Sequence, residues 1–161
     1  MAFVTEIPNV VRIRLLCGHT YSSLLVHCVF STKERRNIIR DPQHLWRYLG
    51  GIARGKEIPL VAAGGTINHV HLLLDLPTTM PIAQGLQHLK GSSAHWLNSA
   101  AIPFAWQQGY GAFAIGESQR QTVLASIANQ EAHHRKYSFE QEFVALLQKY
   151  GIEYDNKFVF G

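Results

Sequence analysis

Length, composition and charge favour one folded domain. The chain has 161 residues, of which 47% are hydrophobic and 16% are charged, and this balance excludes an intrinsically disordered protein. A chain of this length buries enough apolar surface for one compact domain. Its formal net charge of +4 suits an anionic partner such as nucleic acid, although a modest positive excess is also ordinary.

The first residues differ in pattern from the rest. Residues 1–17 are predicted to be an N-terminal extension, because the mixed stretch 10–16 has neither a clear helix cap nor a turn. Two alternatives stay open for this extension, an added edge strand and a poorly ordered arm. Residues 18–161 are predicted to form a single domain.

A strand, a helix and a second strand follow in chain order. The stretch 21–31 (YSSLLVHCVFS) is rich in β-branched and aromatic residues and predicts a buried strand. Asp41-Pro42 is typical of a helix start, and this helix is expected to run to about Gly55. Residues 58–63 predict the second strand, and Gly64-Gly65 predict the turn after it.

The second half predicts a strand, a helix, a strand and two further helices. Ser118 is expected to cap the first of the two last helices, and Ser138 and Gln141 form a capping box at the start of the other. The predicted ranges are 68–76, 81–99, 109–115, 118–136 and 138–150.

The order of these elements predicts the fold class. The first six match the split βαββαβ arrangement of ferredoxin-like (RRM-like) α+β domains, with additional C-terminal helices. One antiparallel sheet would carry two helices on one face and leave the other face for the extra helices and a site. Many nucleic-acid binders use this sheet, but the fold alone does not fix the function.

Two histidines on the third predicted strand are candidate metal ligands. His69 and His71 are two residues apart, so the period of a strand puts both imidazoles on one face of the sheet. Two neutral imidazoles held side by side make half of a metal site. The spacing alone is weak evidence, and two polar side chains on a solvated face explain it equally well.

The predicted helix 118–136 carries further candidates. Ser126 and Gln130 are four residues apart and share a helix face, and the amide oxygen of Gln130 suits a hard divalent cation as a third ligand. An exposed helical glutamine is the alternative. His133 and His134 add two imidazoles, which either join the site or cap the C-terminal end of the helix.

Basic side chains form the candidate nucleic-acid contacts. Lys33, Arg35 and Arg36 follow the first strand, and Lys90 and Arg120 lie further along the chain. Such groups neutralise phosphates in DNA-binding proteins. A solvated loop is the alternative explanation for the first three.

Several motifs together resemble those of a known family. The chain resembles the single-tyrosine HUH transposases of small insertion sequences, namely the IS200-like transposases and the REP-associated tyrosine transposases. The resemblance covers about residues 18–150. The matching segments are Gly18–Tyr21, Val29–Arg36, Asn68–Leu73, Trp106–Phe113 and Asn129–His134, with Ser138, Phe139 and Glu142 following.

The resemblance implies a mechanism and its residues. His69, His71 and Gln130 would hold one Mg²⁺ or Mn²⁺, which polarises the scissile phosphate of single-stranded DNA. A tyrosine one helical turn before the glutamine would attack, giving a 5′-phosphotyrosine and a free 3′-hydroxyl, and reversal would transfer the strand in DNA transposition. The resemblance also implies a homodimer whose active sites are composite.

The chain departs from the family at the nucleophile, because the family tyrosine corresponds to Ser126. A serine hydroxyl is less acidic and shorter in reach than a tyrosine phenol with its pKa of about 10. Tyr110 and Tyr137 do not occupy the required helical position. The sequence therefore predicts a DNA-binding transposase with inactivated or impaired strand cleavage, and whether it is an enzyme stays open.

Two alternatives to this function remain. The first is a non-catalytic, domesticated transposase that binds DNA hairpins. The second is a small metal-dependent hydrolase that uses His69, His71 and a metal-bound water. Against the hydrolase, Asp75 is the only acidic residue that the strand pattern brings near the histidine pair.

Membrane and redox features point to a cytoplasmic protein. No apolar run approaches the roughly 20 residues that span a bilayer, and Glu6, Arg12 and Arg14 interrupt the order of a signal peptide. Cys17 and Cys28 are too few for a disulfide framework. We expect one buried and one exposed reduced thiol and no membrane partner.

Overall fold

A computed structural model describes residues 3–4, 21–99, 103–157 and 159–160. The expectations for residues 5–20, which include Cys17 and the motif at 18–20, lie outside these residues. The elements are β1 (Phe3–Val4), β2 (Leu25–Ser31), the 3₁₀ turn η1 (Lys33–Arg35), α1 (Pro42–Gly55), β3 (Leu60–Gly65), β4 (His69–Asp75), α2 (Ile82–Asn98), β5 (Gly111–Ala114), the 3₁₀ turn η2 (Glu117–Gln119), α3 (Arg120–Ala128), α4 (Gln130–His133) and α5 (Phe139–Lys149).

The sheet has the order β1-β3-β4-β2-β5, and every pair of neighbours is antiparallel. Without β1, the remaining four strands and α1 and α2 have the split connectivity of the ferredoxin-like fold, so the predicted α+β class is confirmed. Residues 3–4 of the predicted extension pair with β3 and form an edge strand. The boundary between extension and domain stays a prediction.

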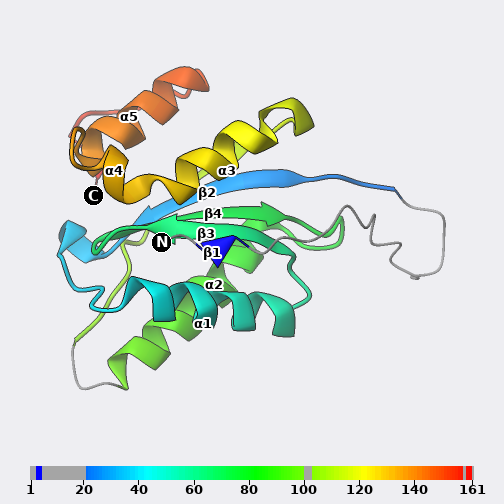
Figure 1. Cartoon of the computed structure of the whole chain (residues 1–161), viewed down its shortest axis with the longest axis horizontal. Coiled ribbons are helices and arrows are strands. Elements are labelled where there is room, and N and C mark those ends of the chain that lie inside the picture. Colours follow the sequence, from blue (N-terminus) through cyan, green and yellow to red (C-terminus); the bar gives the residue numbers. More distant parts are fainter. Residues whose placement is uncertain (1–2, 5–20, 100–102, 158, 161) are drawn as a thin grey trace.

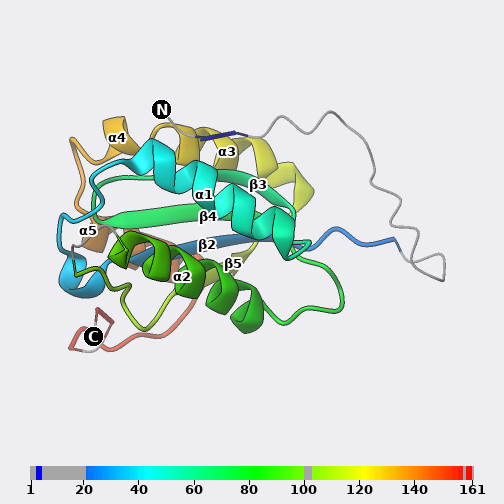
Figure 2. The ribbon, with the colours of Figure 1, turned by 90° about the horizontal axis from the view of Figure 1, so that it is seen from below.

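Helices α1 and α2 cover one face of the sheet, and α3, α4 and α5 lie on the other (Figure 1; Figure 2). The α1 helix begins as predicted, because Asp41 accepts a hydrogen bond from the backbone N–H of His44 and Pro42 follows it. The core between this pair of helices and the sheet is apolar and includes Trp46, Leu72 and Leu89.

Gly64 and Gly65 do not form the predicted turn. Both belong to β3, and the chain turns at residues 66–68 instead. A Cβ atom on Gly64 would lie 2.4 Å from the carbonyl oxygen of Ile127 in α3, and Gly65 has a φ of +143°. The glycines are therefore needed for the close approach of α3 and for the conformation at the strand end.

The helix predicted over 118–136 is divided into shorter pieces. Ser118 lies inside η2 and is not the cap of α3, and Asn129 separates α3 from α4. Asparagine has a low helix propensity, and Asn129 adopts φ −101° and ψ 19° at the break. The break matters for function because Gln130 begins α4 there with a buried side chain.

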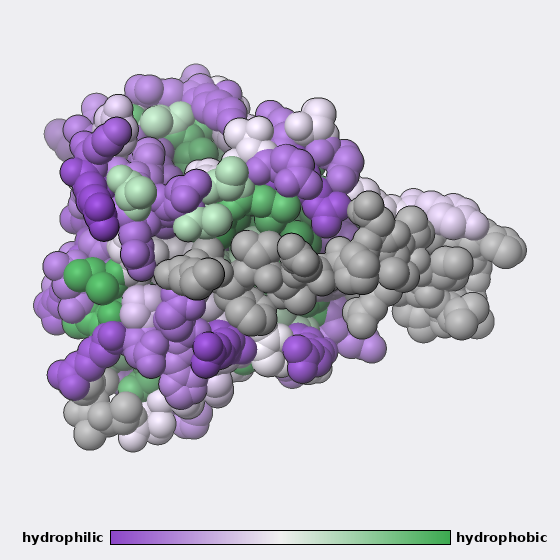
Figure 3. Space-filling view, viewed as in Figure 1, coloured by the Kyte–Doolittle hydropathy of each residue, from purple (hydrophilic) through white to green (hydrophobic). Residues whose placement is uncertain are grey.

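Two smaller apolar clusters hold the C-terminal helices on the sheet. Val123 and Ile127 of α3 pack with Leu73 and Ala62, while Phe139 and Leu147 of α5 pack with Val29 and Phe113. Figure 3 shows hydrophilic residues over the outer surfaces of the helical layers and hydrophobic residues at the level of the sheet between them. No described helix is long and apolar enough to cross a membrane.

Candidate metal and nucleic-acid site

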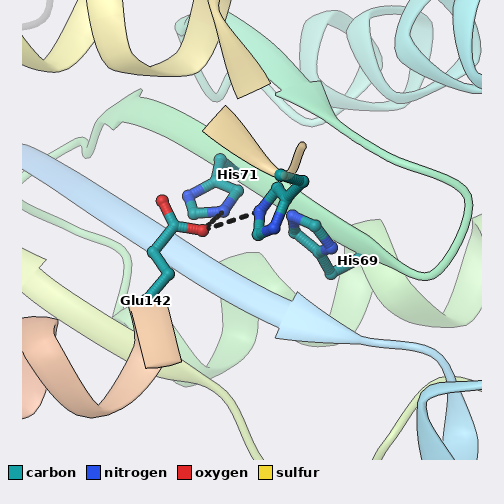
Figure 4. Close-up of side chains that lie close together, drawn as sticks. His69, His71 and Glu142 are labelled. Carbon is teal, nitrogen blue, oxygen red and sulfur yellow. Dashed lines mark ion pairs between the residues drawn. The ribbon is translucent and has the colours of Figure 1, made fainter. Parts of the chain in front are cut away.

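The strand β4 alternates between the two faces of the sheet. Val70, Leu72 and Leu74 join the apolar core under α1 and α2. His69 and His71 point to the opposite face, beneath α4 and α5, where both are 0% exposed (Figure 4). The alternative of a solvated histidine pair is therefore wrong, because the C-terminal helices cover it.

The Nδ1 atoms of both histidines are occupied by protein partners. His69 Nδ1 lies 2.7 Å from Asn68 Oδ1 and 3.0 Å from Thr66 Oγ1, and His71 Nδ1 lies 3.0 Å from His27 Nε2. An acceptor on Nδ1–H leaves the Nε2 lone pair for a cation, which is the usual orientation of a metal-binding histidine. Sequence reasoning missed His27, although the strand period puts it on the same face as Val29.

The side chain of Gln130 enters this cluster from α4. It is only 2% exposed, and its Oε1 lies 3.2 Å from His69 Nε2 and 3.0 Å from His134 Nε2. Its Nε2 donates to Glu142 Oε1 at 3.0 Å. The structure therefore brings together His69, His71 and Gln130, and the alternative of an exposed Gln130 is wrong.

Glu142 is a functional candidate that the sequence did not single out as a ligand, whereas His134 is one of the two imidazoles for which the sequence leaves open joining the site or capping the helix. Glu142 Oε2 lies 3.3 Å from His71 Nε2 (Figure 4). The same oxygen lies 2.9 Å from His134 Nε2. The motif segments contain both residues, so a signal was present. Asp75 is not the acid near the histidine pair; its Oδ1 accepts the backbone N–H of Leu24.

Burial and charge set the protonation of the cluster. Burial lowers the pKa of His69 to about 3 and the pKa of His27 to about 3, so both are neutral at physiological pH. Burial opposes ionisation of Glu142 and His134, but their mutual hydrogen bond and charge outweigh it. The pKa of Glu142 is held well below its ordinary value, and the pKa of His134 is raised.

The residues fit a divalent cation. One buried atom of the cluster, His71 Nε2, makes no hydrogen bond and lies 3.3 Å from Glu142 Oε2, which His134 Nε2 already contacts at 2.9 Å. Such orphaned atoms are uncommon in protein interiors and call for an explanation. A cation between this imidazole and the carboxylate would give His71 Nε2 a partner and share the charge of Glu142.

Ser126 has an exposed side chain on α3, one turn before Gln130. Its backbone carbonyl accepts a hydrogen bond from Gln130 Nε2 at 3.4 Å. No imidazole is hydrogen-bonded to its hydroxyl among the residues that the structure describes.

Three of the five predicted phosphate contacts lie beside this cluster. The loop of Lys33, Arg35 and Arg36 is joined to the turn before β4, since Thr32 N–H donates to the Asn68 carbonyl. Arg35 pairs with Glu140 at 2.8 Å and Arg36 pairs with Glu34, whereas Lys33 is exposed. The basic loop and the histidine pair therefore share one end of the sheet.

The other two predicted cations are placed differently. Lys90 donates to the carbonyls of Gln107, Gln108 and Gly109, and burial lowers its pKa to about 8. Arg120 pairs with Glu117 at the start of α3, the end of that helix remote from Gln130 (Figure 1). Both are held by protein groups, and their contact with DNA stays a prediction.

Comparison with known proteins agrees with this geometry. Residues 20–130 match the family model described as IS200-like transposase. The transposases of the insertion sequence element IS200 from Salmonella typhimurium and from Salmonella typhi are each 30% identical over 81 residues, which are 48% of this chain and 52% of the relative. The match thus spans about half the length of these curated relatives.

Solved structures support the fold. The crystal structure of an inferred transposase from Deinococcus radiodurans R1 has a TM-score of 0.57 and 29% identity, covering 70% of this chain and 94% of that one. The structure of a REP-associated tyrosine transposase bound to a REP hairpin has a TM-score of 0.57 and 14% identity, covering 74% of each chain. The second likeness concerns the fold alone.

Proposed function

We propose, since the chain belongs to the family of IS200-like transposases, that it is a DNA-binding transposase domain with impaired strand cleavage. Its substrate would be single-stranded or hairpin DNA, bound beside His69 and His71. The observation that carries the proposal is the meeting of two buried imidazoles with the amide oxygen of Gln130, 3.2 Å from His69 Nε2, one helical turn after Ser126.

The proposed cofactor is Mg²⁺ or Mn²⁺, which His69, His71 and Gln130 would hold. Such an ion supplies Lewis-acid polarisation of a phosphate oxygen. The chain itself fixes the two imidazoles through Asn68, Thr66 and His27, and burial keeps His69 neutral and ready to bind a cation.

Position 126 determines what the domain does with DNA. A serine at this position is short, and among the described residues no imidazole is hydrogen-bonded to its hydroxyl to accept its proton, so we expect no covalent phosphoserine. Binding would then persist without cleavage, which describes a domesticated hairpin-binding protein. Lys33 and Arg36, beside the turn before β4, would contact phosphates.

The proposed assembly is a homodimer that acts on DNA in the cytoplasm. Within a single chain, however, Gln130 already contacts His69, and Glu142 already contacts His71. A dimer would therefore present two sites whose imidazole, amide and carboxylate groups each come from one chain. If the two subunits exchanged their C-terminal helices, the partner chain would supply Gln130, but the site would contain the same imidazole, amide and carboxylate groups.

Covalent trapping tests the proposal. The purified chain and its Ser126→Tyr variant are incubated with single-stranded hairpin DNA and Mn²⁺, and a denaturation-resistant protein–DNA band is sought. We expect the band only with Ser126→Tyr, because that change restores a phenol one turn before Gln130. Ala125→Tyr is the matched control, since Ala125 is also exposed on α3 but faces another direction.

Two outcomes would count against the proposal. A band from the unchanged chain would show another nucleophile, and its loss in Tyr137→Phe would identify the exposed Tyr137. A band from Ser126→Tyr that survives a second change, His71→Ala, would show that the histidine pair has no part in the reaction.

A second candidate function is a small metal-dependent hydrolase. Glu142 favours it, because this carboxylate lies 3.3 Å from His71 Nε2, where the sequence had indicated no acid but Asp75. Turnover of bis(4-nitrophenyl) phosphate with added Mn²⁺, abolished by His71→Ala, would support a hydrolase. If the chain binds hairpin DNA but does not hydrolyse this substrate, the hydrolase is excluded and the transposase proposal is the one that remains.

A further inference from the structure

The cluster around the histidine pair contains more ligand groups than the two histidines and the glutamine. One ligand atom each from His69, His71, His134 and Glu142 can be chosen so that all four lie within 4.8 Å of one another. Three of these are imidazoles and one is a carboxylate. They come from β4, from the C-cap residue that follows α4, and from α5.

The structure holds each of these groups in place. His134 Nδ1 lies 2.9 Å from the Tyr137 carbonyl oxygen, so its Nδ1–H donates there and its Nε2 is directed at the cluster. The α5 helix that carries Glu142 is fixed at its start by the capping box of Ser138 and Gln141. Phe139 and Leu147 then bury the helix against the sheet.

Hydrogen bonds from the protein alone do not satisfy every polar atom of the cluster. His69 Nε2 and His134 Nε2 both approach the single oxygen Oε1 of Gln130. His71 Nε2 makes no hydrogen bond and faces Glu142 Oε2 at 3.3 Å, an oxygen that His134 Nε2 already contacts at 2.9 Å. His69 and His71 are also completely buried, so water does not solvate them. Ligation of one cation would employ these nitrogen lone pairs together with the negative charge of Glu142.

We propose that His69, His71, His134 and Glu142 form a four-ligand metal site within one chain, with a preference for a transition ion such as Zn²⁺ or Co²⁺ over Mg²⁺. The inference rests on the proposed function, since it concerns the same histidine pair. Imidazole is a favoured ligand of Zn²⁺ and other first-row transition ions, whereas Mg²⁺ prefers oxygen ligands and retains water. Gln130, the third ligand in the proposed function, would then be a hydrogen-bonding neighbour that links the ligands, and His134 and Glu142 would complete the site in its place.

The site would also tie the C-terminal helices to the sheet. Glu142 belongs to α5 and His134 is the C-cap that follows α4, while the other two ligands belong to β4. A bound ion would therefore join β4 to α5 and to the residue that follows α4, a segment that neither of the smaller apolar clusters includes. It would form without a partner chain.

Co²⁺ titration of the full purified chain, freed of metal beforehand, tests the proposal. Visible absorption separates the intense bands of four- or five-coordinate Co²⁺ from the weak bands of the six-coordinate ion. We expect intense bands that Zn²⁺ abolishes at stoichiometric concentration and that a hundredfold excess of Mg²⁺ leaves in place. We expect His134→Ala and Glu142→Gln each to weaken Co²⁺ binding at least tenfold.

Two matched variants control for the loss of a charge or an imidazole elsewhere. Glu140→Gln changes a carboxylate of the same helix that pairs with Arg35, and His88→Ala removes an imidazole from α2 on the other face of the sheet. Both should bind Co²⁺ like the unchanged chain. Circular dichroism of each variant confirms that the fold persists, and Glu142→Asp, which retains the carboxylate, should recover part of the affinity.

The outcomes separate this inference from the proposed function. Unchanged Co²⁺ spectra and affinity in folded His134→Ala and Glu142→Gln, with binding abolished in His71→Ala, would overturn the four-ligand site and leave the three-ligand site of the proposed function. Binding unaffected by His71→Ala would contradict both. Displacement of Co²⁺ by Mg²⁺ at equal concentration would overturn the preference for a transition ion.

Discussion

The two faces of the sheet are built for different tasks. The face under α1 and α2 buries apolar side chains such as Phe30, Trp46 and Leu72. The face under α4 and α5 buries the polar side chains of His27, His69, His71 and Gln130. One strand, β4, supplies both faces through the alternation of its residues.

The difference shows how a fold separates stability from function. Apolar burial provides stability of roughly 25 cal/mol per Å² without any specific partner, whereas a buried polar side chain costs free energy unless each of its atoms is satisfied. The polar face is only partly satisfied by the protein itself. We therefore expect changes on the first face to alter folding, and changes on the second to alter ligand binding.

The largest effect is expected from a cavity on the apolar face. Leu72→Ala should lower the free energy of unfolding by about 2–5 kcal/mol, because Leu72 is fully buried. Urea denaturation followed by circular dichroism measures it. Ile67→Ala is the control, since Ile67 is 46% exposed and should change stability by less than about 0.5 kcal/mol. Equal effects would refute the assigned core.

Removal of the metal should lower the free energy of unfolding only when the histidine pair on the polar face is unchanged. Chelation of an ion present at a hundredfold excess over its dissociation constant should cost about 2.7 kcal/mol, because only the folded chain binds it. Thermal unfolding with Mn²⁺, before and after EDTA, measures the loss. The loss should vanish in His71→Ala and persist in His88→Ala; a loss in both would place the ion elsewhere.

The contact between α3 and β3 should tolerate no side chain at Gly64. Gly64→Ala puts a Cβ atom 2.4 Å from the Ile127 carbonyl oxygen, so α3 must shift, at a cost of about 1–3 kcal/mol. Gly51→Ala is the counterpart in α1, where nothing lies within 4 Å, and it should stabilise by about 0.5–1 kcal/mol. Urea denaturation of both variants measures the two changes in the free energy of unfolding. Changes of the same sign would contradict the close approach of α3 at Gly64.

The smallest effect is expected at the cap of α5. Ser138→Ala removes the side-chain acceptor of the Gln141 N–H and should cost about 1 kcal/mol. Because α5 carries Glu142, the same variant should also weaken metal binding. Ser118→Ala, in the 3₁₀ turn η2, should change neither quantity; a matching loss there would show that the effect is not specific to the cap.

The sequence predicted those helices and strands whose residues show a clear local spacing of apolar side chains. The ranges of α1, α2, β4 and α5 follow from caps and apolar spacing, and the alternation in β4 indicated that His69 and His71 share a face. The break at Asn129 and the inclusion of Gly64 in β3 depend on contacts between distant elements. His27 and Glu142 join the site through the sheet register and the path of α5, which no local pattern contains, whereas His134 was one of the two helix imidazoles that the sequence offered.

The central claim is that DNA binds at the end of the sheet that carries the histidine pair, and fluorescence anisotropy with labelled hairpin DNA tests it most directly. Two double variants are compared: Lys33→Gln with Arg36→Gln in the basic loop, and Arg47→Gln with Arg54→Gln, both exposed on α1. We predict that the loop variant weakens binding and that its affinity depends less steeply on salt, by about 0.7–0.9 in the logarithmic slope for each phosphate that the loop no longer neutralises, while the α1 variant binds normally. Weakened binding by the α1 variant, with the loop variant unaffected, would contradict the account.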